Sequence, residues 1–185
     1  MNLPDRPPAL EAIEVAIWRE LRCASDDRHH EWRTPVLASV DAALGADART
    51  VVLREVDADA KQLRLYTDAR SAKAAQIAAE PRVTLLCWSP RLQWQLRLRG
   101  RAGLVLDESM LRSRWERLRD SAAASDYLSP RPPGSVLAGA TDPPGTEAHF
   151  AIIELQVDAI DWLELHRAGH RRALFDGDGA RWLQP

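Results

Sequence analysis

The segment YTDARSAKAAQI, residues 66–77, combines basic side chains, a hydroxyl and the start of a predicted helix. Ser71 is the expected N-cap of that helix, Lys73 falls in its first turn, and Arg70 precedes it. A lysine in a first turn opposes the helix macrodipole. Two cations, a hydroxyl and free backbone N–H groups together suit a bound phosphate. The alternative is that Arg70 and Lys73 are solvated surface charges.

A second pair of cations, Arg49 and Arg54, brackets the apolar run in RTVVLR. Residues five apart on a regular strand face opposite sides, so these two arginines should serve different partners unless a bulge intervenes. A guanidinium beside an apolar strand needs a carboxylate, a phosphate or water. The alternative to a ligand is an ion pair with Glu55 or Asp57.

Other chemistries are disfavoured by spacing and context. His166 and His170 have an i, i+4 spacing that suits zinc only on a helix, but they fall in a predicted strand and turn. Cys23 and Cys87 lack metal-ligand spacing. No Ser/His/Asp arrangement can be argued from the pattern.

Composition predicts one globular domain over residues 1–185. The net charge of -2 leaves no basic excess for nucleic acid. No apolar run approaches the roughly 20 residues of a membrane span, and the first residues lack the layout of a signal peptide. We therefore expect a cytoplasmic protein with neither a nucleic-acid nor a membrane partner.

Hydrophobic periodicity places the elements that position these residues. The first thirty residues predict an amphipathic helix and a polar link, with Ile13, Ile17 and Leu21 on one face. Strands are predicted by alternating or β-branched runs at 34–41, 49–57, 61–68, 82–89 and 92–106, and by the segments 148–165 and 170–185. The strand 82–89 is apolar enough to be buried on both faces. In 92–106 the polar residues Gln95, Arg97 and Arg99 share one face.

Residues 107–125 predict another helix, and residues 129–148 a long Pro- and Gly-rich loop of the kind that is usually functional or bound to a partner. Antiparallel hairpins with helices between them indicate a small barrel. The expected fold class is α+β, mainly antiparallel β, with about six strands and flanking helices.

Five motifs occur in an order that resembles one known family. RTVVLR, LYTDARSAK, RVTLLCW, QWQLRLRGRA and LELHRAGHRRALF, from about Trp32 onward, resemble the pyridoxamine 5'-phosphate oxidase-like FMN-binding split barrels, in particular their bacterial branch of uncharacterised FMN-binding proteins. The resemblance implies an FMN-binding split β-barrel and a homodimer with FMN at or near the interface.

The resemblance also implies site residues. The FMN-binding positions that it assigns are Arg49, Thr50, Val51, Val52, Arg54, Tyr66, Thr67, Arg70, Ser71, Lys73, Gln95 and Arg172. Of these, Ser71 and Lys73 match phosphate ligands, and Arg172 is expected to act across the dimer interface. Candidate substrate residues are Arg54, Arg117, Ser121 and His170. His170 is a candidate acid or base, and a structural hydrogen bond is an equally good reading.

Departures from the family pattern affect the substrate side most. Ala72 stands where the oxidases carry a second arginine, with Arg70 as the candidate replacement. Ala168 stands where they place an arginine against the substrate, Leu163 where they place a tryptophan beside the flavin, and Ser113 where they place a tyrosine. We therefore expect an FMN-dependent oxidoreductase for an unidentified small molecule. The alternatives are a non-catalytic FMN-binding, storage or sensing protein and a genuine pyridoxamine 5'-phosphate oxidase.

Overall fold

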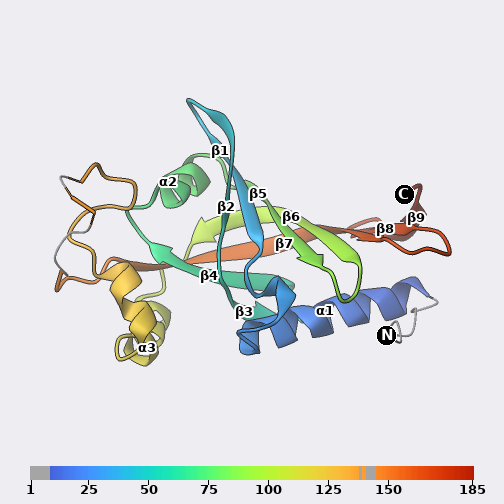
Figure 1. Ribbon diagram of the computed structural model, residues 1–185, viewed down its shortest axis with the longest axis horizontal. Helices are drawn as coiled ribbons and strands as arrows, with labels where there is room; N and C mark the ends of the chain where they lie inside the picture. Colours follow the sequence, from blue (N-terminus) through green and yellow to red (C-terminus); the bar gives the residue numbers. More distant parts are fainter. Residues whose placement is uncertain (1–8, 138, 141–144) are drawn as a thin grey trace.

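The computed structural model describes residues 9–137, 139–140 and 145–185 of the chain (Figure 1). The predicted features that extend into residues 1–8, 138 and 141–144, namely the start of the N-terminal segment and part of the Pro-rich loop, lie outside the described residues. The elements in chain order are α1 (Leu10–Asp26), η1 (Glu31–Arg33), β1 (Val36–Asp41), β2 (Gly45–Thr50), β3 (Leu53–Asp57), β4 (Gln62–Asp68), α2 (Ala72–Ala79), β5 (Arg82–Ser89), β6 (Trp94–Leu104), α3 (Glu108–Leu118), η2 (Ala122–Tyr127), β7 (Phe150–Glu164), β8 (Arg171–Asp176) and β9 (Gly179–Leu183).

The strands form one antiparallel sheet in the order β2-β1-β5-β6-β7-β4-β3, with β8 paired to β7 and β9 to β8. This confirms the predicted α+β, mainly antiparallel class. The number of strands was underestimated, because the described residues hold nine strands rather than about six. The long β7 accounts for the branch, since Gln156 and the residues before it pair with β4, whereas Ile160 and the residues after it pair with β8.

The predicted strand 49–57 is wrong as a single element. It is divided at Val51–Val52 into the end of β2 and all of β3, and β2 begins at Gly45, before the predicted start at Arg49. The two halves lie at opposite ends of the strand order, yet only two residues join them. The sheet must therefore curl until its two ends meet, which is the geometry of a split barrel.

The core lies inside this curl and under α1, whose buried Ile13, Ile17 and Leu21 confirm the predicted apolar face. Four indoles lie in it, and three of them, Trp32, Trp94 and Trp162, pack against one another. The strand β5 corrects another expectation. Its residues alternate between buried and more exposed, so it is buried on one face only.

The other face of β5, β6, β7 and β8 turns away from the core. It carries Thr84, Leu86 and Trp88 from β5, Gln95, Arg97 and Arg99 from β6, Asp161 and Leu163 from β7, and Arg172 from β8, as the strand registers require. We call this surface the open face. The predicted polar face of β6 is thereby confirmed.

Candidate functional site

The start of α2 gathers the residues predicted to hold a phosphate. The Lys73 Nζ donates a hydrogen bond of 3.0 Å to the Thr67 Oγ1, which lies 3.0 Å from the Ser71 Oγ. Ser71 occupies the N-cap position, as predicted, but its side chain makes no capping hydrogen bond and contacts Thr67 instead. The Thr67 and Ser71 hydroxyls are buried, so Lys73 is the side chain of these three that can interact with a charged ligand.

Electrostatics at Lys73 favour an anion. Burial lowers the pKa of its ammonium below the ordinary value, and the positive charge of Arg49 lowers it further, while Asp68 acts in the opposite direction. A half-buried cation with a second cation close by is costly unless negative charge arrives. The four side chains Arg49, Thr67, Ser71 and Lys73, which we call the phosphate cluster, therefore combine two hydroxyls with the kind of positive charge that a phosphate group needs.

Arg49 is held rigidly on the core side of β2. Its Nη1 donates to the Ser39 Oγ at 2.5 Å, and its Nη2 donates to the Gln76 Oε1 at 2.8 Å and to Asp47. Gln76 belongs to α2 and also donates to Asp47 at 2.9 Å. This network ties the β1–β2 hairpin to α2 and fixes Arg49 relative to Lys73.

Arg70 does not replace the arginine missing at Ala72, so that expectation is wrong. Its guanidinium is paired with Asp68 at 2.7 and 3.0 Å, and its Nη2 donates to the Ser129 carbonyl oxygen at 2.8 Å. The first contact ties it to the end of β4 and the second to the loop after η2. Arg70 therefore holds that loop and is not a free donor beside Lys73.

Arg54 has neighbours other than those of Arg49, although the break at Val51–Val52 and a register shift between Leu53 and Glu55 remove the regular strand on which the spacing argument relied. Its guanidinium lies 5.5 Å from the centre of the Tyr66 ring, and its buried Nε has no hydrogen-bond partner among the described residues. Neither Arg49 nor Arg54 pairs with Glu55 or Asp57. The ion-pair alternative is thus not what the structure shows.

Glu55 instead joins α3 to the barrel. It accepts hydrogen bonds of 2.9 and 3.0 Å from Arg114 and one of 2.7 Å from the Tyr66 hydroxyl. The Arg114 hydrogen bond is the main cause that lowers the pKa of Glu55 to about 2, with Tyr66 and Arg64 adding to it against the effect of burial. Sequence reasoning did not single out Arg114, because its partner lies 59 positions away.

The candidate substrate residues do not gather around Arg54. Arg117 folds back along α3 to the Ser113 hydroxyl at 3.1 Å, and Ser121 donates to the Leu118 carbonyl oxygen at 2.7 Å. His170 is exposed, and its Nδ1 accepts a hydrogen bond of 3.0 Å from the backbone N–H of His166. That bond matches the structural reading of His170.

Gln95 and Arg172 lie on the open face, in one row across the sheet. Gln95 pairs in register with Leu163, and Leu163 with Arg172. Arg172 makes two hydrogen bonds, of 3.0 and 2.9 Å, to Asp161, which also accepts from Arg97 at 2.6 Å. The buried Asp161 was missed in the sequence, although it orients both arginines and they lower its pKa.

The phosphate cluster and the Gln95–Arg172 row lie far apart within one chain. Thr67 pairs with Ala151 near the start of β7, whereas Arg172 pairs with Leu163 near its end. The twelve residue steps from Ala151 to Leu163 along β7 cover about 40 Å when extended. Figure 1 shows β7 crossing the molecule with α2 near one end and β8 at the other. One chain therefore does not bring the two groups together.

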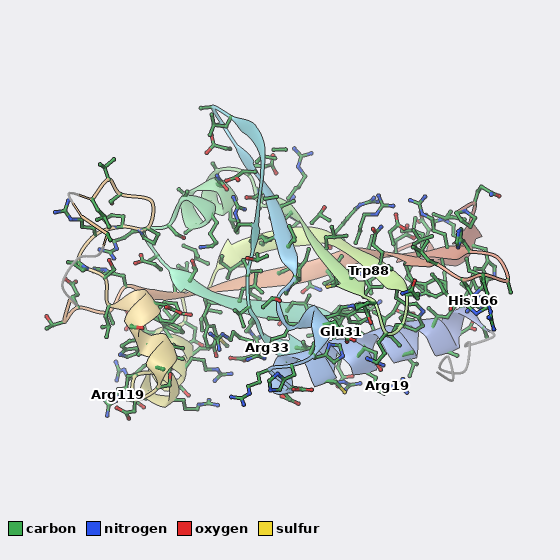
Figure 2. The ribbon with its side chains drawn as sticks, viewed as in Figure 1. Arg19, Glu31, Arg33, Trp88, Arg119 and His166 are labelled. Carbon is green, nitrogen blue, oxygen red and sulfur yellow. The ribbon has the colours of Figure 1, made fainter. Side chains whose placement is uncertain are left out.

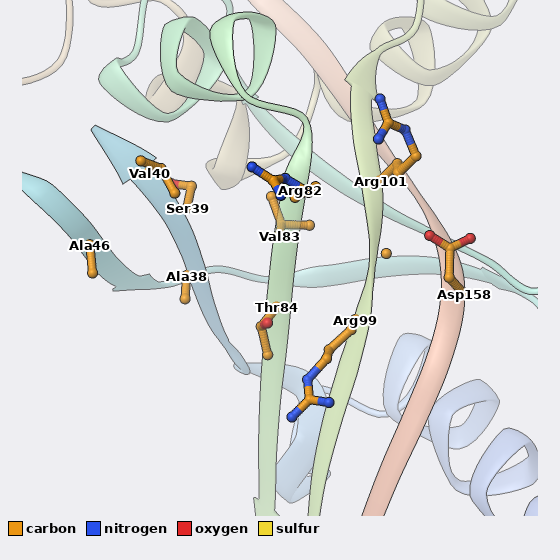
Figure 3. Close-up of a pocket in the computed structure, with 11 residues that line it drawn as sticks. Ala38, Ser39, Val40, Ala46, Arg82, Val83, Thr84, Arg99, Arg101 and Asp158 are labelled. Carbon is orange, nitrogen blue, oxygen red and sulfur yellow. The ribbon is translucent and has the colours of Figure 1, made fainter. Parts of the chain in front are cut away.

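Between them the open face is hollowed by a cavity of about 510 Å³ (Figure 3). Arg82, Arg99 and Arg101 line it together with a single carboxylate, Asp158, and with small side chains of β1. The excess of positive charge suits an anionic or acidic neighbour.

Comparisons with known proteins identify the class. Residues 15–106, from α1 to just beyond β6, match the family model described as pyridoxamine 5'-phosphate oxidase, FMN-binding domain. A pyridoxine/pyridoxamine 5'-phosphate oxidase of Anaeromyxobacter dehalogenans is 30% identical over 128 residues, which are 67% of this chain and 64% of that protein. One of Granulibacter bethesdensis is 30% identical over 164 residues, which are 80% of this chain and 77% of that protein.

The chain belongs to the pyridoxamine 5'-phosphate oxidase-like family of FMN-binding proteins. The solved structure of PhzG from Burkholderia lata 383, in complex with tetrahydrophenazine-1-carboxylic acid, shares the fold with a TM-score of 0.73 at 17% identity, covering 100% of this chain and 98% of that one. The phosphate cluster fits the cofactor of this family, since its desolvated lysine and neighbouring arginine suit a phosphate.

Two further findings concern only the described residues. None of their helices is long and apolar enough to cross a membrane. They also contain no group of three or more His, Cys, Asp or Glu side chains placed to hold a metal ion.

Proposed function

We propose that this protein binds FMN between two copies of the chain and is an FMN-dependent oxidoreductase for a small molecule other than pyridoxamine 5'-phosphate. The observation that carries the proposal is the phosphate cluster, in which burial and Arg49 lower the pKa of Lys73. A dianionic phosphate would relieve this unfavourable charge arrangement.

In the proposed site one chain holds the phosphate. Lys73, Arg49, Ser71 and Thr67 bind it, and the backbone at residues 50–52, where β2 crosses to β3, lies beside the cofactor together with Tyr66. The second copy contributes Gln95 and Arg172 from its open face, because they lie too far along β7 to act within their own chain. When bound, FMN supplies the electron-transfer chemistry, and the protein positions it and tunes its potential.

The substrate is proposed to differ from pyridoxamine 5'-phosphate. Ala168 offers no charged, planar donor to a phosphorylated pyridine. Arg117 and Ser121 are both turned onto their own backbone segments. Of the candidate substrate residues this leaves Arg54, whose buried Nε has no hydrogen-bond partner among the described residues. The complex of PhzG shows that a protein with this fold accommodates a ligand of another chemical class, a carboxylated ring system.

The cofactor half is tested by equilibrium binding of FMN and riboflavin to the cofactor-free protein. We expect FMN to bind far more tightly, and Lys73→Ala to weaken FMN binding by about one to two orders of magnitude, since a charge-assisted hydrogen bond contributes about 1.5–3 kcal/mol. Arg119→Ala is the matched control, because Arg119 is an exposed cation at the C-terminal end of α3 (Figure 2). Equal affinity for riboflavin, or equal effects of the two variants, would contradict the phosphate assignment.

The substrate half is tested with the FMN-loaded protein, by following oxygen-dependent formation of pyridoxal 5'-phosphate. Loss of a positioning contact commonly costs about a hundredfold in rate, so turnover should be very slow. Turnover like that of a true oxidase would show that pyridoxamine 5'-phosphate is a substrate of this protein. No turnover with any electron donor despite full FMN loading would favour a storage or sensing protein.

A further inference from the structure

Trp88, at the end of β5, is a large aromatic side chain on the open face. Figure 2 labels its position. Its neighbours Cys87 and Ser89 are fully buried, yet 41% of Trp88 is exposed. Other indoles of this chain contact one another through tilted or edge-on rings, but Trp88 takes no part in any of those ring contacts among the described residues. An exposed indole beside a polar row is a surface feature that fits a flat ligand or a partner.

The strand registers place Trp88 in the same row as the proposed cofactor contacts. Trp88 pairs with Gln95, Gln95 with Leu163, and Leu163 with Arg172. Residues directly opposite each other in an antiparallel sheet point to the same face, and neighbouring strands are about 4.8 Å apart. Trp88 therefore stands beside Gln95, on the side away from Arg172.

The rest of the row explains why an aromatic group is needed at that position. Leu163 is the only apolar side chain between Gln95 and Arg172, and Trp162 points to the opposite face, where it packs edge-on against Trp94. A flavin ring laid over the row would meet hydrogen-bonding groups at Gln95 and Arg172. It would have one large flat surface to stack on, the indole of Trp88.

We propose that Trp88 stacks against the flavin ring of the FMN whose phosphate is held by the second copy of the chain. This assignment rests on the proposed function. It makes Trp88 a cofactor-contacting residue that limits how far the flavin can slide along the open face.

The experiment measures flavin fluorescence of FMN-loaded protein. An indole in contact with a flavin quenches its emission by donating an electron to the excited ring and taking it back, so neither group is consumed. Trp88→Phe and Trp88→Ala should raise the emission and its lifetime several-fold. Trp88→Ala should also weaken FMN binding by about two- to tenfold, the range expected for one aromatic stacking contact.

Trp182→Phe is the matched control. Trp182 is exposed to a similar degree, 47%, but it lies on the other face of the sheet, near Trp162 and Arg171. Its substitution should leave flavin emission and FMN affinity unchanged. Thermal unfolding of the cofactor-free variants checks that each one folds. If Trp88→Ala does not fold, Trp88→Phe, which keeps an aromatic ring, still tests the assignment.

The outcomes separate this inference from the proposed function. Unchanged emission and affinity in both Trp88 variants, with FMN still bound, would overturn the role of Trp88 alone. A weaker dimer by light scattering without any change in flavin emission would also overturn it, because Trp88 would then contact the partner protein. Failure of the unaltered protein to bind FMN would overturn the proposed function and this assignment together.

Discussion

At the scale of single residues, Lys73 is the side chain whose protonation matters most. Its pKa is lowered in the free protein, first by burial and then by Arg49. In the unfolded chain a lysine has a pKa of about 10.4. At pH values between the lowered pKa of the folded protein and about 10.4, the unfolded chain binds more protons at Lys73 than the folded protein does. The destabilising effect of the charged Lys73 is therefore present below this pH range and disappears as pH rises through it.

Bound phosphate reverses the effect. A dianion beside Lys73 stabilises the ammonium, so the pKa of Lys73 should rise on FMN binding, and binding should take up protons at alkaline pH. We expect FMN affinity to fall as pH rises through the lowered pKa of Lys73. The measurement is the FMN dissociation constant from pH 7 to about 10.4 for the unaltered protein and for Lys73→Arg, whose guanidinium stays charged. A fall of the same steepness in Lys73→Arg would exclude Lys73 as its cause.

Residue roles could be predicted from the sequence only where the partners are close in the chain. Thr67, Ser71 and Lys73 lie within seven positions, and the structure brings them together. Asp161 and Arg114 were not predicted, because Asp161 meets Arg97 across 64 positions and Arg114 meets Glu55 across 59. Contacts of that range depend on strand register, which no local pattern contains.

At the scale of elements, the bulge in β7 opposite Arg99 and Gly100 of β6 is the feature most sensitive to a small change. The register with β7 shifts between Arg99 and Gly100. A Cβ at Gly100 would lie 1.9 Å from the Gln156 carbonyl oxygen, a backbone atom that cannot move without disturbing β7. Only glycine allows the two strands to approach this closely.

We expect Gly100→Ala to destabilise the protein by at least about 3 kcal/mol, the upper range for overpacking. For a domain of this size that lowers the melting temperature by about 6–12 °C. Gly103→Ala is the control, since nothing lies within 4 Å of its added Cβ and it belongs to the same strand. Thermal unfolding followed by circular dichroism makes the comparison. Equal melting temperatures would show that β7 adjusts at no cost.

The element boundaries show where periodicity predicts well and where it fails. The alternation in β6 identified both of its faces, because a period of two is a local property of an extended chain. The run RTVVLREVD contains no glycine or proline, so nothing local marks the break at Val51–Val52. That break arises from the closure of the barrel, where β2 and β3 take different partners. The apolar composition of β5 wrongly predicted burial on both faces for a similar reason, because its second face belongs to the open face, which no local pattern marks.

At the scale of the whole molecule, the separation along β7 predicts a site shared by two chains. Lys73→Ala removes the phosphate half, and Arg172→Ala removes the open-face half. Arg172→Ala should still fold, because Asp161 keeps its hydrogen bond to Arg97. Each variant alone should bind FMN weakly.

A mixed dimer of the two variants should regain one intact site. The Arg172→Ala chain supplies Lys73, and the Lys73→Ala chain supplies Arg172. We expect co-expressed, differently tagged chains to bind one FMN tightly per dimer, as measured by titration after tandem purification. Weak binding by the mixed dimer would place both halves in the same chain. A monomer that binds FMN tightly would contradict the shared site outright.

The position of β7 in the chain has a consequence for how the protein folds during synthesis. Residues 150–164 are the common neighbour of β4 and β6, yet they are made long after both. Until then two strand edges have no partner, and unpaired edges invite association with other chains. Contacts this distant in sequence also slow folding. The nascent chain should therefore depend on protection by chaperones late in its synthesis, and fragments that end before β7 should aggregate when expressed alone.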